Sequence, residues 1–219
     1  DINITQGTTI GARSAAYEMN EKLQKGNNFM AARAIQNQFS IHDFNLLKNT
    51  GFTHCRYGYK LDEKVGSAPN YTIPYVDKQN IINAVNYAIS TNMIIVVNPV
   101  HNWSNSGGFT GVESDYEKLG KIWEQVSDLL ANYSKELVVF EVINEPHAGH
   151  DIARIINTSL ASIRNSPGNE DRIVIVPGDG FSTRQALIDA FNNNEIPGDD
   201  DYLIGTFHYY DPRPYTKQG

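Results

Sequence analysis

The feature that most constrains the fold is a regular alternation of short β-branched runs with longer helical patterns. Because strands that alternate with helices of about 10–15 residues form βαβ units, the chain is predicted to be an α/β protein with a parallel sheet. The predicted strands are Asn27–Ala32, Thr53–Tyr59, Ile94–Val100, Leu137–Asn144, Ile173–Pro177 and Leu203–Tyr210. The predicted helices are Ser14–Gln24, Ile41–Asn49, Asp77–Thr91, Asp115–Tyr133, Asp151–Arg164 and Thr183–Asn193.

This alternation leaves two architectures open, a doubly wound sheet and a (β/α)8 barrel. A doubly wound nucleotide-binding protein should carry a Gly-rich phosphate loop after its first strand. Neither Gly-x-Gly-x-x-Gly nor the P-loop pattern occurs, and Gly178-Asp179-Gly180 lacks both a third Gly and a Lys. Nucleotide binding is therefore disfavoured, and Gly178–Gly180 is interpreted as a strand-to-helix turn.

Composition excludes several other classes of protein. The net charge of −7 disfavours nucleic-acid binding, because an acidic chain repels phosphate backbones. The longest apolar run, Met93–Val97, is far shorter than the roughly 20 residues of a membrane helix. The single cysteine, Cys55, allows neither an internal disulfide nor a cysteine-based metal site, and we expect it to pack under the helices.

Polar side chains gather at the carboxyl ends of the predicted strands, which is the active face of a barrel. Glu145 follows an apolar strand and precedes Pro146, and burial at such a rim favours the neutral carboxyl that a general acid needs. Asn144 beside it is suited to bonding a substrate hydroxyl. The other residues at these ends are Arg56, His101, His208 and Tyr210.

Three segments resemble glycoside hydrolase family 5, the cellulase and mannanase family of clan A. Asn144-Glu145-Pro146 resembles the acid/base motif, Gly51–Arg56 the second strand, and Phe207–Pro212 the sixth strand. Ala15–Asn28 resembles the approach to the first strand, although Asn28–Ala31 departs from the usual Asn-Leu-Gly-Asn. The resemblance implies a (β/α)8 TIM barrel and covers essentially the whole chain.

The resemblance also implies roles for individual residues. Glu145 would be the general acid/base, and Asn144 would bind the sugar 2-hydroxyl. Arg56 would orient the nucleophile and keep it ionised, and Tyr210 would lie beside that nucleophile. His208 would bond near Glu145. His101 would correspond to the third-strand histidine of the family.

A retaining mechanism needs a second carboxylate, roughly 5–5.5 Å from the first. In the family this nucleophile ends the seventh strand, whereas the sixth predicted strand here ends at Tyr210. We therefore expect about six of eight βα units, in one incomplete catalytic domain over residues 1–219 with an N-terminal extension and helix at 1–25. The nucleophile would come from missing C-terminal sequence or a second chain, since none of Asp179, Asp211, Glu63 and Glu113 has family support.

Several residues carry alternative interpretations. Glu141 should point into the barrel and pair with a base, and Trp123 should lie in the core. Trp103, Phe109 and Tyr215 lie in loops where they would either stack on sugar rings or pack as ordinary loop residues. Metal catalysis by His101, His147, His150 and His208 is disfavoured because no His-x-His or His-Glu-x-x-His pattern occurs.

The resulting prediction is a secreted retaining endo-β-1,4-glycanase, with an endoglucanase (cellulase) as the first choice and a mannanase as the second. The substrate would be a β-1,4-linked polysaccharide or oligosaccharide, and no cofactor or metal would be needed. No nucleic acid or membrane partner is expected. The alternatives are a non-catalytic glycan-binding protein and an unrelated α/β enzyme in which Arg56, Glu145 and His208 do not converge.

Overall fold

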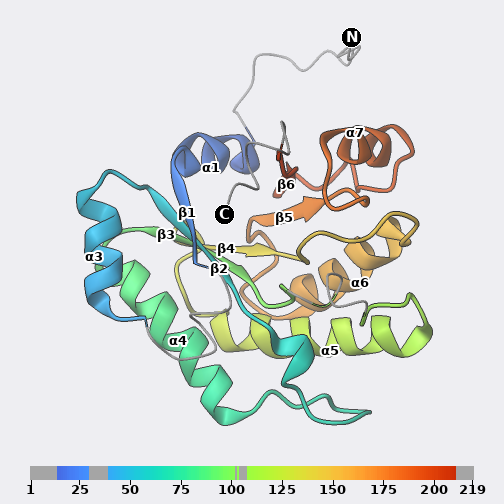
Figure 1. The fold of residues 1–219 in the computed structure, drawn as a ribbon, viewed down its shortest axis with the longest axis horizontal. Helices are drawn as coiled ribbons and strands as arrows, with labels where there is room; N and C mark the ends of the chain where they lie inside the picture. The colour runs from blue at the N-terminus through green and yellow to red at the C-terminus, as the bar shows by residue number, and fades with distance from the viewer. Residues whose placement is uncertain (1–13, 30–38, 102, 104–107, 211–219) are drawn as a thin grey trace.

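A computed structural model describes residues 14–29, 39–101, 103 and 108–210. In these residues six strands form one sheet, and every neighbouring pair is parallel. The strands are β1 (Gly26–Phe29), β2 (His54–Gly58), β3 (Ile94–Asn98), β4 (Val138–Glu141), β5 (Val174–Pro177) and β6 (Leu203–Thr206). The helices are α1 (Ala15–Leu23), α3 (Ile41–Asn49), the 3-10 helix η1 (Leu61–Glu63), α4 (Tyr75–Ser90), α5 (Glu113–Leu130), α6 (Ile152–Asn165) and α7 (Arg184–Asn192) (Figure 1).

The strand order decides between the two predicted architectures. A doubly wound sheet reverses its order at a switch point, where its ligand binds. Here the order runs from β1 to β6 without reversal, and the sheet curls so that α1 faces one side and α3, α4, α5 and α6 cover the other (Figure 1). The described chain is therefore part of a barrel, as predicted.

The two faces of the sheet alternate along each strand. In β3, Ile95 and Val97 pack outward into the larger core beneath the helices, while Ile94 and Val96 pack inward. Cys55 and Trp123 lie in the outer core, which confirms both predictions. The inward residues form a smaller core with α1.

Helix α1 packs against the inner face of the sheet. Ser14 caps its first turn by accepting a hydrogen bond from Tyr17 N, and Met19 and Leu23 are buried against the inner core. Ala16 N donates to Asp201 O at 3.1 Å, just before β6. The first helix thus joins the two ends of the described sheet.

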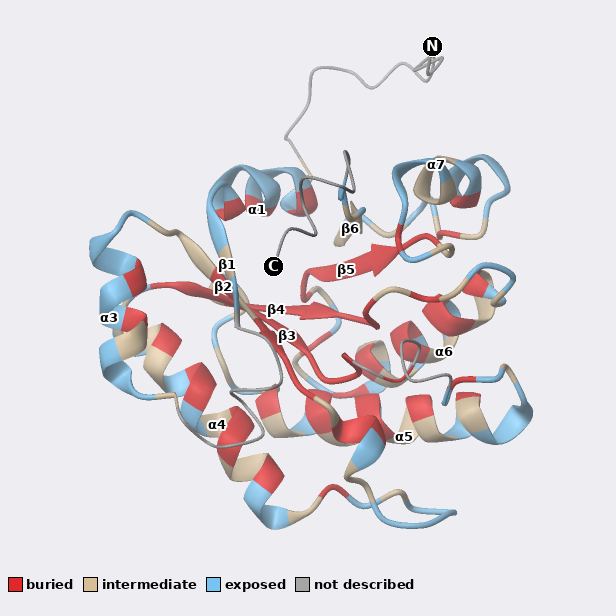
Figure 2. Cartoon of the chain, in the orientation of Figure 1, coloured by how far each residue is buried: buried red, intermediate tan, exposed pale blue. Residues whose placement is uncertain are grey.

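The strands β3, β4 and β5 are buried throughout, whereas β6 is half-buried along its whole length (Figure 2). β4 and β6 are also shorter than predicted, because pairing ends at Glu141 and at Thr206. No helix in the described ranges is both long and apolar enough to cross a membrane.

Candidate functional site

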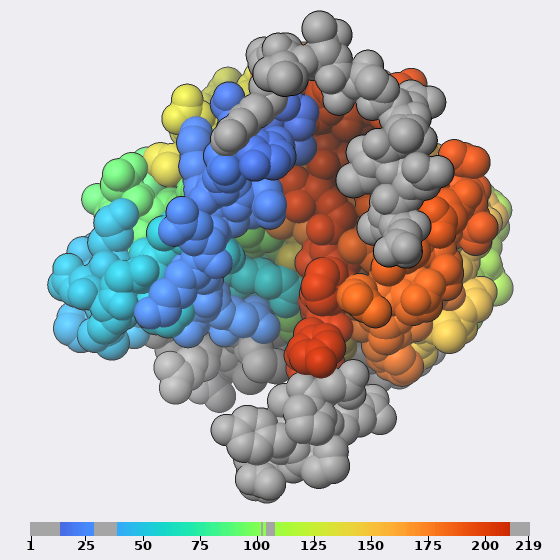
Figure 3. All heavy atoms as spheres, turned by 90° about the horizontal axis from the view of Figure 1, so that it is seen from above, coloured from blue at the N-terminus to red at the C-terminus, as the bar shows by residue number. Residues whose placement is uncertain are grey.

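The carboxyl ends of β2 and β4, and the segment after β6, meet at one end of the inner face. Arg56 lies in the middle of β2, and Glu141 is the last residue of β4. Since β3 separates these two strands, only side chains that point into the barrel can meet across it. Seen from above, the molecule is hollowed between its N-terminal segment (blue) and β6 (red) (Figure 3).

Arg56 and Glu141 form a two-pronged ion pair across β3. Nε and one terminal nitrogen of Arg56 each donate to a different Glu141 oxygen, both at 2.6 Å. Burial alone would raise the pKa of Glu141, but the charge and hydrogen bonds of Arg56 outweigh it and lower the pKa below its usual value. Glu141 is therefore held as a carboxylate, as the predicted base pairing required.

Arg56 also reaches the Asn144 side chain. Its terminal nitrogen donates to Asn144 Oδ1 at 2.8 Å, and Asn144 N donates to Val100 O at 3.1 Å. These bonds fix a buried amide and set its oxygen toward the guanidinium. The Nδ2 group carries the donor hydrogens of this amide, and a sugar hydroxyl can accept such hydrogens.

Glu145 sits in a tight turn after β4. Its φ of 42° is left-handed, which is uncommon for a residue with a side chain, and Pro146 follows it. Its Oε1 lies 2.6 Å from His208 Nδ1 and accepts a hydrogen bond from the Tyr210 hydroxyl at 2.8 Å. Partial burial, followed by the hydrogen bond to Glu145, raises the pKa of Tyr210 to about 12 and keeps that hydroxyl a donor.

His101 is buried beside this network. Burial, and then the positive charge of Arg56, lower the pKa of His101 to about 4, so the ring is neutral around neutral pH. Its ring lies so close to Gly58 that a Cβ there would be 2.4 Å from Nδ1. Only glycine at position 58 leaves His101 room at the site.

The structure corrects the placement of Trp103. Its ring is 4% exposed and packs edge-on against Phe109 at 5.0 Å, with Lys118 Nζ 4.6 Å from its centre. Phe109 is equally buried, at 3% exposed. Trp103 and Phe109 therefore follow the loop-packing interpretation rather than offering an open face to a sugar, while Tyr215 lies outside the described residues.

The other carboxylates considered as substitutes for the nucleophile do not join this network. Glu113 pairs with Arg154, Glu63 lies near Lys60, and Asp179 accepts a hydrogen bond from Gly149 N. Asp211 is outside the described residues. In the described part of the chain, no group of three or more His, Cys, Asp or Glu could hold a metal ion.

Two hollows adjoin the network. One of about 290 Å³ lies on the inner face, lined in part by His54, Arg56, Glu141 and His208. A wider groove of about 990 Å³ runs beside it and combines residues that the sequence singled out with others that it did not. Its lining includes Phe181, Arg184, Gln185 and Phe207, together with His208, Tyr209 and Tyr210.

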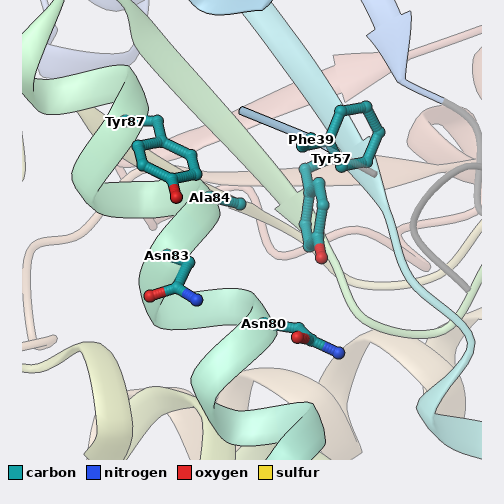
Figure 4. Close-up of a pocket in the computed structure, with 6 residues that line it drawn as sticks. All are labelled: Phe39, Tyr57, Asn80, Asn83, Ala84 and Tyr87. Carbon is teal, nitrogen blue, oxygen red and sulfur yellow. The ribbon is translucent and has the colours of Figure 1, made fainter. Parts of the chain in front are cut away.

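A third hollow, of about 110 Å³, lies on the other side of the sheet. Figure 4 shows Tyr57 of β2 facing Asn80, Asn83 and Tyr87 of α4 across it. None of its lining residues belongs to the Arg56–Glu145 network, so we place the functional site at the strand ends instead.

Sequence reasoning predicted a turn after β5 but missed that residues Asp179–Ser182 of this turn contact the segments carrying Glu145 and His208. Phe181 N donates to Pro146 O, and His208 N donates to Ser182 O, both at 2.7 Å. The signal in the sequence was Gly178-Asp179-Gly180, which predicted a turn but not what the turn would contact.

Solved structures with a similar fold include Cel5A and an endo-β-1,4-glucanase. Thermotoga maritima Cel5A in complex with cellobiose matches 93% of the chain with a TM-score of 0.78 and 23% identity, and the match covers 66% of that structure. A tri-modular endo-β-1,4-glucanase from Bacillus licheniformis, complexed with cellotetraose, matches 92% of the chain with a TM-score of 0.76 and 26% identity, over 41% of that structure. These matches confirm the partial (β/α)8 barrel.

Curated relatives have consistent names. Endoglucanase H of Acetivibrio thermocellus is 31% identical over 182 residues, which is 80% of this chain, and endoglucanase B of Ruminococcus albus is 28% identical over 90% of it. The chain spans 19% and 49%, respectively, of the lengths of these two relatives. The family model for cellulase (glycosyl hydrolase family 5) matches residues 16–219. The chain therefore belongs to the cellulase family, glycosyl hydrolase family 5.

Proposed function

We propose that this chain forms most of the catalytic barrel of a retaining endo-β-1,4-glucanase, with Glu145 as its general acid/base. The observation that carries the proposal is the convergence of two hydrogen-bonded clusters on the inner face. Arg56 bonds Glu141 and Asn144, while Glu145, the next residue in the chain, bonds His208 and Tyr210. The two clusters are close enough for Arg56 to feel the charge of Glu145. The names of the curated relatives support a β-1,4-glucan as the substrate.

The chemistry is a double displacement. Glu145 protonates the leaving oxygen while a carboxylate attacks the anomeric carbon, and Glu145 then takes a proton from the water that releases the sugar. Asn144 Nδ2 bonds the 2-hydroxyl, an interaction that strengthens in the transition state. His208 and Tyr210 hold the Glu145 carboxyl in place, and Arg56 supports the attacking carboxylate. These steps require neither a metal nor a cofactor.

The attacking carboxylate is assigned to a part of the protein outside the described residues. Glu141 is unsuited to that role, because both of its oxygens are bonded to Arg56 at 2.6 Å. We propose that the nucleophile comes from further sequence of the same protein or from a second chain. Because insoluble glucans lie outside cells, the protein is proposed to act as a secreted enzyme.

The test is reducing-sugar release from soluble cellulose derivatives and from mannan, by the chain alone and by a longer form that includes the sequence following it. Glu145→Gln in the longer form should abolish release, whereas the exposed Glu63→Gln should leave it unchanged. Faster hydrolysis of mannan than of glucan would replace the substrate assignment.

The remaining outcomes separate the alternatives. Glucan binding without hydrolysis by a folded longer form would favour a non-catalytic glycan-binding protein. Activity of the 219-residue chain alone would contradict an external nucleophile, and undiminished activity of Glu145→Gln would contradict the acid/base assignment.

A further inference from the structure

The turn Asp179–Ser182, between β5 and α7, is bonded to both sides of the Glu145–His208 contact. Phe181 N donates to the carbonyl of Pro146, the residue after Glu145, at 2.7 Å. His208 N donates to the carbonyl of Ser182, also at 2.7 Å. One short turn therefore holds the backbones that carry the two partners of a 2.6 Å side-chain contact.

The turn replaces regular strand pairing at this edge. The last paired residues of β5 and β6 are Pro177 and Thr206. The next bond joins Ser182 to His208, so residues 178–181 loop out opposite Phe207 alone. In this loop the chain reaches the segment after β4 as far along as Pro146.

Asp179 anchors the turn with its side chain. Its Oδ2 accepts a hydrogen bond from Gly149 N at 3.0 Å, and its carbonyl accepts one from Ser182 N at 2.9 Å. The Phe181 ring packs on His147 with 4.6 Å between centres. Together with the bond from Phe181 N to the Pro146 carbonyl, the bond from Gly149 N and the ring contact with His147 attach the turn at three points to the segment that follows Glu145.

The backbone of the turn is strained. Gly180, Phe181 and Ser182 have φ values of 56°, 63° and 56°, all left-handed. Such a conformation costs about 1 kcal/mol or more at each residue with a side chain, and it persists only where the surroundings impose it. The Ser182 hydroxyl is buried without a hydrogen-bond partner, so this residue acts through its backbone carbonyl.

We propose that the turn Asp179–Ser182 is a positioning element that sets the contact between Glu145 and His208. Asp179 and Ser182 act through other residues and are positioning residues, not catalytic ones. The catalytic meaning of this role rests on the proposed function, whereas the contact itself can be tested without any hydrolysis.

The experiment is nuclear magnetic resonance of the ¹⁵N-labelled chain, following the ring nitrogens of His208 as the pH is changed. Glu145→Gln defines the signal of a lost contact. Titratable or charged groups around His208 include Tyr210, Glu141, Arg56, His54 and Arg184, and all variants retain them. Thermal unfolding of each variant reports whether the fold is retained.

Two pairs of variants isolate the turn. Asp179→Ala removes the anchor, while Asp179→Asn keeps an oxygen that can accept from Gly149 N. Ser182→Val places a β-branched residue in the left-handed region, while Ser182→Gly fits it without strain. We expect Asp179→Ala and Ser182→Val to move the His208 ring-nitrogen chemical shifts toward those of Glu145→Gln, and both controls to match the wild type.

Unchanged His208 signals in folded Asp179→Ala and Ser182→Val would overturn the proposal. So would equal changes in the two controls, or a loss of fold in both test variants, which would mark the turn as purely structural. If only one of the two test variants folds, the comparison of that variant with its own control decides the outcome. Hydrolysis retained by Glu145→Gln would remove the acid/base role and leave the NMR result intact, so the two proposals fail separately.

Discussion

At the scale of single residues, the Arg56–Glu141 pair organises the site. The Glu141 side chain is 3% exposed and that of Arg56 is 16% exposed, so both charges are largely removed from water. A buried charge is tolerated only when it is paired and hydrogen-bonded. The pair therefore fixes the guanidinium, which in turn fixes the Asn144 amide.

Removing one partner of this pair should cost more than removing both. Glu141→Leu leaves a buried guanidinium without its partner and should lower the free energy of unfolding by about 3–5 kcal/mol. Glu141→Leu combined with Arg56→Met should recover most of that loss, because no buried charge remains. Urea unfolding of the single and double variants measures both, and additive losses would contradict the coupling.

Asp62 should make stability depend on pH. Burial, and then the charge of Glu63, raise the pKa of Asp62 from 3.8 to about 6. Because the pKa of Asp62 is higher in the folded state than in the unfolded state, protonation of Asp62 stabilises the fold. This stabilisation is complete at pH values below the unfolded-state pKa of Asp62, and it is lost as the pH rises through about 6. Relative to Asp62→Asn, the wild-type free energy of unfolding should fall by roughly 2–3 kcal/mol from pH 4 to pH 7. Urea unfolding at each pH measures this fall in the free energy of unfolding, and Asp189→Asn, at an exposed aspartate, is the control. Parallel curves of stability against pH for the wild type and Asp62→Asn would refute the prediction.

Some residues of the site could be predicted from the sequence, and others could not. Arg56, Asn144, Glu145 and His208 were identified because each lies within or just after a strand in a recognisable segment. The sequence could not decide between sugar stacking and loop packing for Trp103, because the exposure of a loop aromatic depends on neighbours, here Phe109 and Lys118, that no local pattern reveals.

At the scale of elements, every predicted helix and strand is present, because the helices bury one face at a helical period and the buried strands form short β-branched runs. The ends are less predictable. The apolar run continues past β4, but Val142 N bonds to β5 and Asn144 N bonds to the segment after β3 outside regular pairing. Where a strand stops is decided by its neighbours, and so is the contact between the Asp179–Ser182 turn and Glu145.

The end of α5 is held by a buried cation. Arg172 is fully buried and donates to the carbonyls of Val138, Leu130 and Tyr133, at 2.9, 3.1 and 3.1 Å. It thereby joins the last turn of α5 to β4, and burial lowers its pKa to about 10. All three carbonyls accept from the same guanidinium, which makes the junction sensitive to a single substitution.

Arg172→Met should therefore lower stability by about 3–5 kcal/mol, because it strips hydrogen bonds from buried carbonyls. In a domain of this size that loss lowers the melting temperature by roughly 6–20 °C. Arg184→Met, at an exposed arginine on α7, is the control in the same calorimetric measurement. A melting temperature within about 2 °C of the wild-type value would show that the junction does not depend on Arg172.

At the scale of the whole molecule, the described sheet has two edges. β1 pairs only with β2 and β6 only with β5 in the part of the chain that the structure describes. Unpaired edges and exposed apolar side chains promote association between chains. Phe191, Phe207 and Tyr209 lie beside β6 and are 49%, 46% and 70% exposed. This edge is consequently the surface most prone to contact another strand or helix.

The isolated 219-residue chain should self-associate through that edge. Phe191 lies on α7 next to β6, so close that a Cβ at Gly205 would be 3.1 Å from its ring. Phe191→Lys places a charge beside the edge without entering the strand, and it should shift the association to higher protein concentration. Val76→Lys is the matched control, since Val76 is 59% exposed on α4, on the helix-covered side of the sheet.

Sedimentation velocity over a concentration series measures the association of the wild type and of both variants. Equal effects of the two substitutions would show that general surface charge, and not the β6 edge, governs association, whereas a monomeric wild type at every concentration would show that the edge is already protected.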